Sequence, residues 1–192
     1  MKCGIALLFI VFGGLATAEP ITVRLANTAG VPDRILSHAE AVAGYILERT
    51  GIEVTWLACP ELPECHRDPE AAGFPLQILK QRPAHLHGDT AGFAVIVPPP
   101  GTSRRYAGVF FPVVQDAARS LEANEAVLLG VTLVHEIGHL LLGSQAHSVQ
   151  GVMAPHFGRE HARLAGRGQL LFTPEQALQM QKEIRQRHAA AR

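Results

Sequence analysis

The sequence predicts a single α+β domain in which a small, twisted mixed sheet packs on helices. Segments with the apolar patterns of strands lie in the first half of the chain, with one helix among them. Segments with apolar residues at helical spacing dominate the second half. No linker divides the 192 residues, a length that suffices for one domain with its own core.

The first half of the chain is predicted to hold five strands and a helix. Residues 21–26 alternate apolar and polar side chains, as a half-buried strand does. The apolar residues of 32–50 share one helical face, and Gly51 follows where a left-handed cap is needed. The remaining strands are predicted at 52–58, 75–80, 91–97 and 106–111.

The second half is predicted to be helical around one turn-rich segment. Pro112 can open a short helix over 112–119, and a long apolar helix follows at about 122–142, ending at Gly143. Residues 144–172 are rich in turn formers. The last helix runs to about residue 188, and a cap, a proline and a capping-box glutamine mark its start at Thr173, Pro174 and Gln176.

The N-terminus has the pattern of a secretory signal peptide over residues 1–18. Lys2 precedes an apolar stretch over 3–15, and Ala16-Thr17-Ala18 forms a cleavage motif before Glu19. The alternative is an uncleaved membrane anchor, but the apolar stretch is short for a bilayer span. We therefore expect a mature chain of residues 19–192, cut near Ala18-Glu19, secreted or periplasmic and without a membrane anchor.

Cleavage would also remove Cys3 and leave two cysteines, Cys59 and Cys65. An even number of cysteines in an exported chain predicts a disulfide, here closing a short loop. The alternative is a pair of metal ligands, although no second pair accompanies them.

The charge balance argues against a nucleic-acid partner. The chain has 17 Lys plus Arg and 17 Asp plus Glu, so its net charge is close to zero. Ten histidines are many for this length, and several lie after residue 134. That clustering is a first indication of metal chemistry.

The strongest motif is His135-Glu136-Ile137-Gly138-His139 on the long helix. Residues four apart share a helical face, so His135 and His139 can bind one Zn²⁺. Glu136 can reach a water molecule at the open position of the metal and act as the general base of a hydrolase. The alternative is an amphipathic helix with two ordinary histidines, but three polar side chains in so apolar a helix are costly unless they are used.

A catalytic zinc site needs a third protein ligand, and His147 is the leading candidate. It lies eight residues after His139, beyond the glycine that ends the helix. Glu160, His156 and His161 are rivals, but residues 155–160 lack a convincing helix start. His156 or a nearby arginine could instead stabilise the oxyanion of a tetrahedral intermediate.

The pattern His-Glu-x-x-His, Gly143, His147-Ser148 and a methionine before a proline resembles the metzincin metallopeptidases, and most closely their matrixin-like branch. That family has two residues on each side of the glycine, whereas this chain has three. The resemblance implies a zincin-like fold with one Zn²⁺, His135, His139 and His147 as ligands, and Glu136 as base. It also implies that Met153 is the turn methionine under the metal, the alternative being ordinary core filling.

The resemblance further implies an edge strand above the helix against which an extended substrate pairs. The run Gly108-Val109-Phe110 is the candidate, the alternative being a core strand. The predicted function is a secreted, monomeric zinc metalloendopeptidase acting on peptide or protein substrates. The alternatives are a non-catalytic zinc- or peptide-binding protein of the same fold, and a zinc hydrolase of non-peptide amides.

Overall fold

The computed structural model of the chain describes residues 19–60, 73–82, 90–97 and 104–190. Its five strands form one mixed sheet in the order β2-β1-β3-β5-β4. Neighbouring strands are parallel except β4, which runs antiparallel to β5 at one edge. The strands are β1 (Glu19–Asn27), β2 (Ile52–Cys59), β3 (Gly73–Leu79), β4 (Gly92–Val97) and β5 (Arg104–Phe110). All five predicted strands are thus confirmed, with boundaries shifted by at most two residues.

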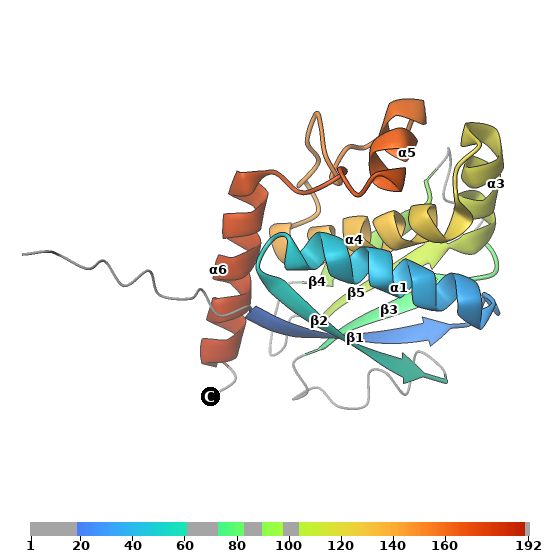
Figure 1. The fold of residues 1–192 in the computed structure, drawn as a ribbon. Coiled ribbons are helices and arrows are strands. Elements are labelled where there is room, and N and C mark those ends of the chain that lie inside the picture. The colour runs from blue at the N-terminus through green and yellow to red at the C-terminus, as the bar shows by residue number, and fades with distance from the viewer. Residues whose placement is uncertain (1–18, 61–72, 83–89, 98–103, 191–192) are drawn as a thin grey trace, which may run out of the picture.

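Helices cover one face of this sheet (Figure 1). They are α1 (Asp33–Glu48), α3 (Phe111–Leu121), α4 (Glu125–Leu142), α5 (Arg159–Gly166) and α6 (Pro174–Ala190). The long helices α1 and α4 run side by side across the sheet, and α6 contacts α4 and β1. The mixed sheet and its helices agree with the predicted α+β class.

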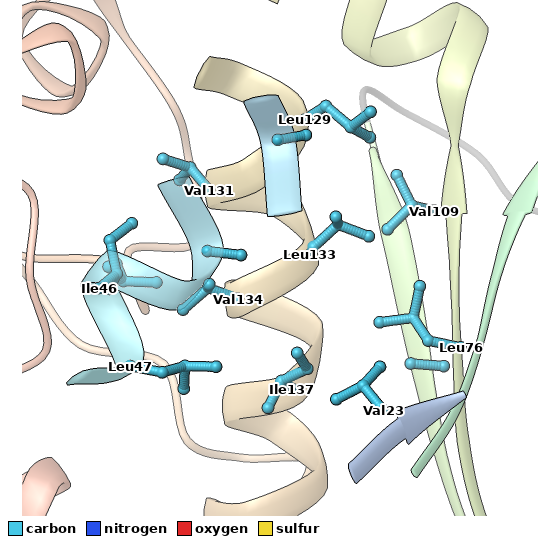
Figure 2. Packing of buried hydrophobic residues seen from close by; sticks show 14 of the residues in the cluster. Val23, Ile46, Leu47, Leu76, Val109, Leu129, Val131, Leu133, Val134 and Ile137 are labelled. Carbon is cyan, nitrogen blue, oxygen red and sulfur yellow. The ribbon is translucent and has the colours of Figure 1, made fainter. Parts of the chain in front are cut away.

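The core lies on both sides of α4. Figure 2 shows Leu129, Leu133 and Ile137 of α4 pointing at the sheet, while Val131 and Val134 point at α1. All five side chains are buried, which explains why α4 is apolar almost all round. The helix is as long and as apolar as a membrane span, yet its surface is mostly taken up by these contacts.

The start of the long helix differs from the prediction. The long helix begins at Glu125, not at about 122, because Glu122 adopts a left-handed conformation (φ 53°) that ends α3. Asn124 then caps α4, its side-chain oxygen accepting a hydrogen bond from the Val127 amide at 3.1 Å. The apolar pattern locates the helix, but this cap sets where it starts.

The turn-rich segment 144–172 contains a helix that the sequence analysis missed. Gly158 stands at the N-cap of α5, whose inward face is formed by the small residues Ala162 and Ala165. Two alanines give too weak an apolar period to predict a helix. Elsewhere the turn predictions are confirmed: Gly51 has φ 75°, and Thr173 and Gln176 form the capping box of α6.

Two predictions fall on the rest of the chain. The signal peptide, residues 1–18, lies outside the described residues. Cys59 ends β2, but Cys65 also lies outside them, so the disulfide stays a prediction.

Candidate metal centre

Three histidines come together beside the C-terminal half of α4. His135 and His139 lie on one face of the helix, and His147 comes from the loop that follows it. The Nε2 atom of His139 lies 3.0 Å from that of His135 and 3.2 Å from that of His147. The ligand atoms of all three lie within 4.8 Å of one another, so this cluster could hold a metal ion.

The chain reaches this arrangement through a sharp exit from α4. The helix runs on to Leu142, and Gly143 then takes a positive φ of 103° that a side chain would disfavour. The amide of Ala146 donates to the Gly143 carbonyl at 3.2 Å and closes the turn. His147 therefore folds back toward His139 even though three residues stand on each side of the glycine.

Backbone carbonyls orient the two helical imidazoles. The Nδ1 atom of His135 lies 2.8 Å from the Val152 carbonyl, and that of His139 lies 3.2 Å from the Gly143 carbonyl. Because a carbonyl only accepts, Nδ1–H donates in both cases and each Nε2 lone pair is left for a metal.

The protonation states also suit metal binding. Burial, aided by repulsion from the neighbouring imidazoles, lowers the pKa of His135 to about 4 against the opposing effect of its carbonyl bond. Burial likewise lowers the pKa of His139. Both rings are therefore neutral near neutral pH, and a neutral imidazole is the form that binds a metal.

Glu136 lies buried beside this cluster. The residue is only 4% exposed, and its Oε2 atom is buried with no hydrogen-bond partner among the described residues. Burial raises the pKa of this carboxyl to about 8. The side chain lies against Gly92 of β4, where an added Cβ would come within 2.8 Å of the Glu136 Cδ atom. The candidate base thus lies between α4 and the edge of the sheet.

Met153 lies under the same stretch of helix. It is fully buried, and its Sδ and Cε atoms pack against Gly138, between the two helical histidines in sequence. The ring of Phe172 fills the other side of this contact, 3.0 Å from where a Cβ on Gly138 would stand. Thioether and phenyl groups thus pack together on the helix at Gly138, between the positions of His135 and His139.

The rival ligands do not join the cluster. Glu160 is exposed on α5 and pairs with Arg163, whose hydrogen bonds lower the pKa of the Glu160 carboxyl. The His161 Nδ1 atom accepts from the Gly158 amide at 3.4 Å, and its ring stacks on Phe157. His156 is exposed and outside the group as well. Of the candidates, the structure brings only His147 to the two helical histidines.

The predicted edge strand needs correction. Gly108, Val109 and Phe110 belong to β5, which pairs with β3 on one side and β4 on the other. They are buried inside the sheet, so the core-strand alternative is the correct one, and β4 is one of the two edges of the described sheet. Both strands are apolar and adjacent in sequence, and composition alone does not tell which of them ends a sheet.

No protein-family model matches the chain, and no curated protein matches it either. The resemblance to metzincins therefore rests on the motif between His135 and Met153.

Several contributing residues escaped the sequence analysis. Gly92 makes room for Glu136, and a glycine inside a strand is a known sign of such close approach. Gln176 was expected only in a capping box, but its side-chain amide also donates to the Ser148 hydroxyl. The Val152 carbonyl that orients His135 has no signature in the sequence.

Proposed function

We propose that this chain is a zinc-dependent metallopeptidase of zincin-like fold, with His135, His139 and His147 as ligands and Glu136 as general base. One observation carries the proposal: three imidazole ligand atoms converge at the helix that carries the buried carboxyl of Glu136, whose Oε2 atom has no hydrogen-bond partner among the described residues. A helix with ordinary histidines would need neither the third imidazole nor the buried acid.

The donor set fits Zn²⁺. Zinc–nitrogen bonds of about 2.0–2.1 Å in a tetrahedron place two ligand nitrogens about 3.3 Å apart. The two short Nε2 separations, 3.0 and 3.2 Å, are close to that value, and the third lies within 4.8 Å. A small rotation of His147, which is exposed on its loop, would complete the triangle. Three protein ligands leave one position open, as hydrolytic zinc sites do.

The site suits peptide hydrolysis. When bound, Zn²⁺ would acidify a water molecule and polarise the scissile carbonyl. Glu136 would accept a proton from that water and deliver it to the departing amine. Burial of the carboxyl supports this role, since a carboxyl with a raised pKa holds and releases a proton near neutral pH. Binding alone would need no such acid, which favours catalysis over a purely zinc-binding protein.

An extended peptide is the substrate that the sheet favours. β4 is an edge strand of the described sheet, and Glu136 lies against its first residue, Gly92. A peptide pairing with β4 would run past the carboxyl and the three imidazoles. This assigns to β4 the role that the sequence analysis gave to Gly108-Val109-Phe110. A signal peptide over 1–18 would place the activity outside the cytoplasm.

The test is metal content together with cleavage. We expect the wild-type protein to bind one zinc per chain and to cut members of a peptide library. His147→Ala should lose most of the zinc, whereas Glu136→Gln should keep it and stop cutting. His161→Ala is the matched control, a histidine outside the cluster, and should change neither. A wild-type chain without zinc affinity, or a Glu136→Gln variant that cuts normally, would overturn the proposal.

A further inference from the structure

The loop that carries His147 is fastened to the start of α6. The amide of Val152 donates to the Leu171 carbonyl at 3.1 Å, just before the helix begins. Gln176, in the first turn of α6, donates from its side-chain Nε2 to the Ser148 hydroxyl at 3.2 Å. Two bonds from one short segment thus hold both ends of the stretch 148–152.

His147 depends on this fastening more than the other two histidines do. His135 and His139 lie on a buried helix, and each ring bonds a backbone carbonyl. His147 is exposed, and no described residue hydrogen-bonds its Nδ1 atom. Apart from the two neighbouring imidazoles, its position therefore depends on the backbone of its loop.

Ser148 makes three of the hydrogen bonds that hold that loop. Its amide donates to the Met153 carbonyl at 2.9 Å, and its hydroxyl donates to the Gln150 carbonyl at 2.8 Å. The same hydroxyl accepts the bond from Gln176, so its donor and one acceptor position are both used. The next residue, Val149, is 99% exposed, so its side chain adds no packing contact that would hold the tip of the loop.

The capping box of α6 orients the Gln176 amide toward Ser148. The backbone amide of Thr173 donates to the Gln176 Oε1 atom at 3.0 Å. A backbone N–H requires an acceptor, so the oxygen must face Thr173 and the NH₂ group must face Ser148. One side chain therefore both starts the helix and holds the loop beside His147.

We propose that Gln176 is a positioning residue for the third metal ligand, acting on His147 through Ser148. The inference rests on the proposed zinc site. Without the bond from Gln176, the loop samples more conformations, and binding zinc must then restrict His147 to one of them. Groups that hydrogen-bond a metal-binding histidine directly typically change metal affinity about 10- to 100-fold, and Gln176, which acts one residue further out, should lie at the low end of that range.

The test is a double-mutant cycle on zinc affinity with Ser148→Ala, Gln176→Ala and both together. We expect each single variant to bind zinc about tenfold more weakly, and the double variant to be scarcely weaker than either. Thr173→Ala is the matched control. It removes the other bond of the same capping box, from the Gln176 amide to the Thr173 hydroxyl, and touches no group of the loop. It should lower stability and leave zinc affinity unchanged.

A second readout separates this inference from the zinc proposal. In metal-free protein, hydrogen exchange of residues 144–150 should quicken in Gln176→Ala and not in Thr173→Ala. If wild type binds no zinc while exchange behaves as expected, the zinc function is wrong but the role of Gln176 in holding the loop stands. Additive losses of affinity, or equal losses in Gln176→Ala and Thr173→Ala, would show that Gln176 acts only through the stability of α6.

Discussion

Met153 occupies the space that a side chain at Gly138 would need. A Cβ built on Gly138 would overlap the Met153 Sδ atom and lie 3.3 Å from its Cε atom. Both residues are buried, so neither can move toward solvent. The turn at 151–153 therefore approaches the histidine-bearing helix closely because position 138 has no side chain.

Gly138→Ala should destabilise the protein although alanine is the better helix former. The propensity gain is about 1 kcal/mol, and overpacking a buried contact costs about 1–3 kcal/mol. Urea unfolding of the metal-free protein measures the balance. Gly44→Ala is the matched control, because a Cβ there meets only Val54, at an ordinary 3.8 Å. It should be neutral or stabilising, and equal effects at both positions would contradict the tight contact.

Gly92→Ala should impair catalysis while sparing the metal. The added Cβ would lie 2.8 Å from both the Glu136 Cδ atom and the Gly108 carbonyl oxygen. The backbone of β5 is paired on both sides, so the flexible glutamate side chain is the part that shifts most easily. A displacement of about 1 Å can cost about a hundredfold in rate. We expect zinc content to stay near one per chain and kcat to fall at least tenfold, and unchanged turnover would show that Glu136 is not the base.

The sequence predicts the histidine cluster better than the strands beside it. The cluster depends on spacing along one helix, whereas the order of the strands depends on pairing between distant segments. His135, Glu136 and His139 stand on one helical turn, where spacing along the chain fixes geometry. The position of Gly143 favours His147 over Glu160 as the third ligand, and the structure brings His147 to the pair. Which of β4 and β5 is the edge depends on long-range pairing, and short-range patterns do not encode that.

The missed features share a physical cause. Bonds such as those of Gln176 to Ser148 and of Arg105 to Leu140 join residues 28 and 35 positions apart. They use common polar side chains whose partners are backbone or hydroxyl groups, so the sequence carries no motif for them. They become visible only once the helices are packed on the sheet.

Arg105 should stabilise the folded protein by binding the C-terminal turn of α4. Its guanidinium donates to the Leu140 carbonyl in the last turn of that helix and lies 3.0 Å from the Glu183 carboxylate on α6. Arg105→Met keeps the apolar stem but leaves Leu140 and Glu183 without this donor. Hydrogen bonds to charged groups contribute about 1.5–3 kcal/mol each, so we expect a loss of about 2 kcal/mol in the free energy of unfolding.

The control for Arg105 is Arg119→Ala. Arg119 pairs with Asp116 on the solvent-facing side of α3, where both side chains are more than two-thirds in solvent. Exposed pairs add little, so urea unfolding should detect almost no change. Similar losses in the free energy of unfolding for the two variants would mean that the bond from Arg105 to Leu140 contributes no more to stability than an exposed ion pair.

The buried Glu136 carboxyl should make a contribution to the stability of the metal-free protein that is lost as the pH rises from about 4.5 to about 8. The Glu136 carboxyl ionises near pH 4.5 in the unfolded chain, whereas burial raises its pKa to about 8 in the folded one. Over that window the folded state holds a proton that the unfolded state releases, so alkalinity favours unfolding. The full shift corresponds to roughly 3–5 kcal/mol, at about 1.4 kcal/mol for each pH unit.

Glu136→Gln isolates this effect, because an amide does not titrate. His135 acts in the opposite direction: its pKa falls from 6.5 to about 4 on folding, so its contribution to stability is lost as the pH drops through that range. Urea unfolding with a chelator present, from pH 5 to 9, should give a nearly flat wild-type profile up to about pH 6.5, where the two effects oppose each other, and a decline from there to about pH 8. Glu136→Gln should instead lose stability below about pH 6.5 and show no decline above it. Parallel profiles above pH 6.5 would mean that the Glu136 carboxyl is ionised in the folded metal-free state. Adding Zn²⁺ should abolish the alkaline decline in wild type, since a nearby cation favours the carboxylate.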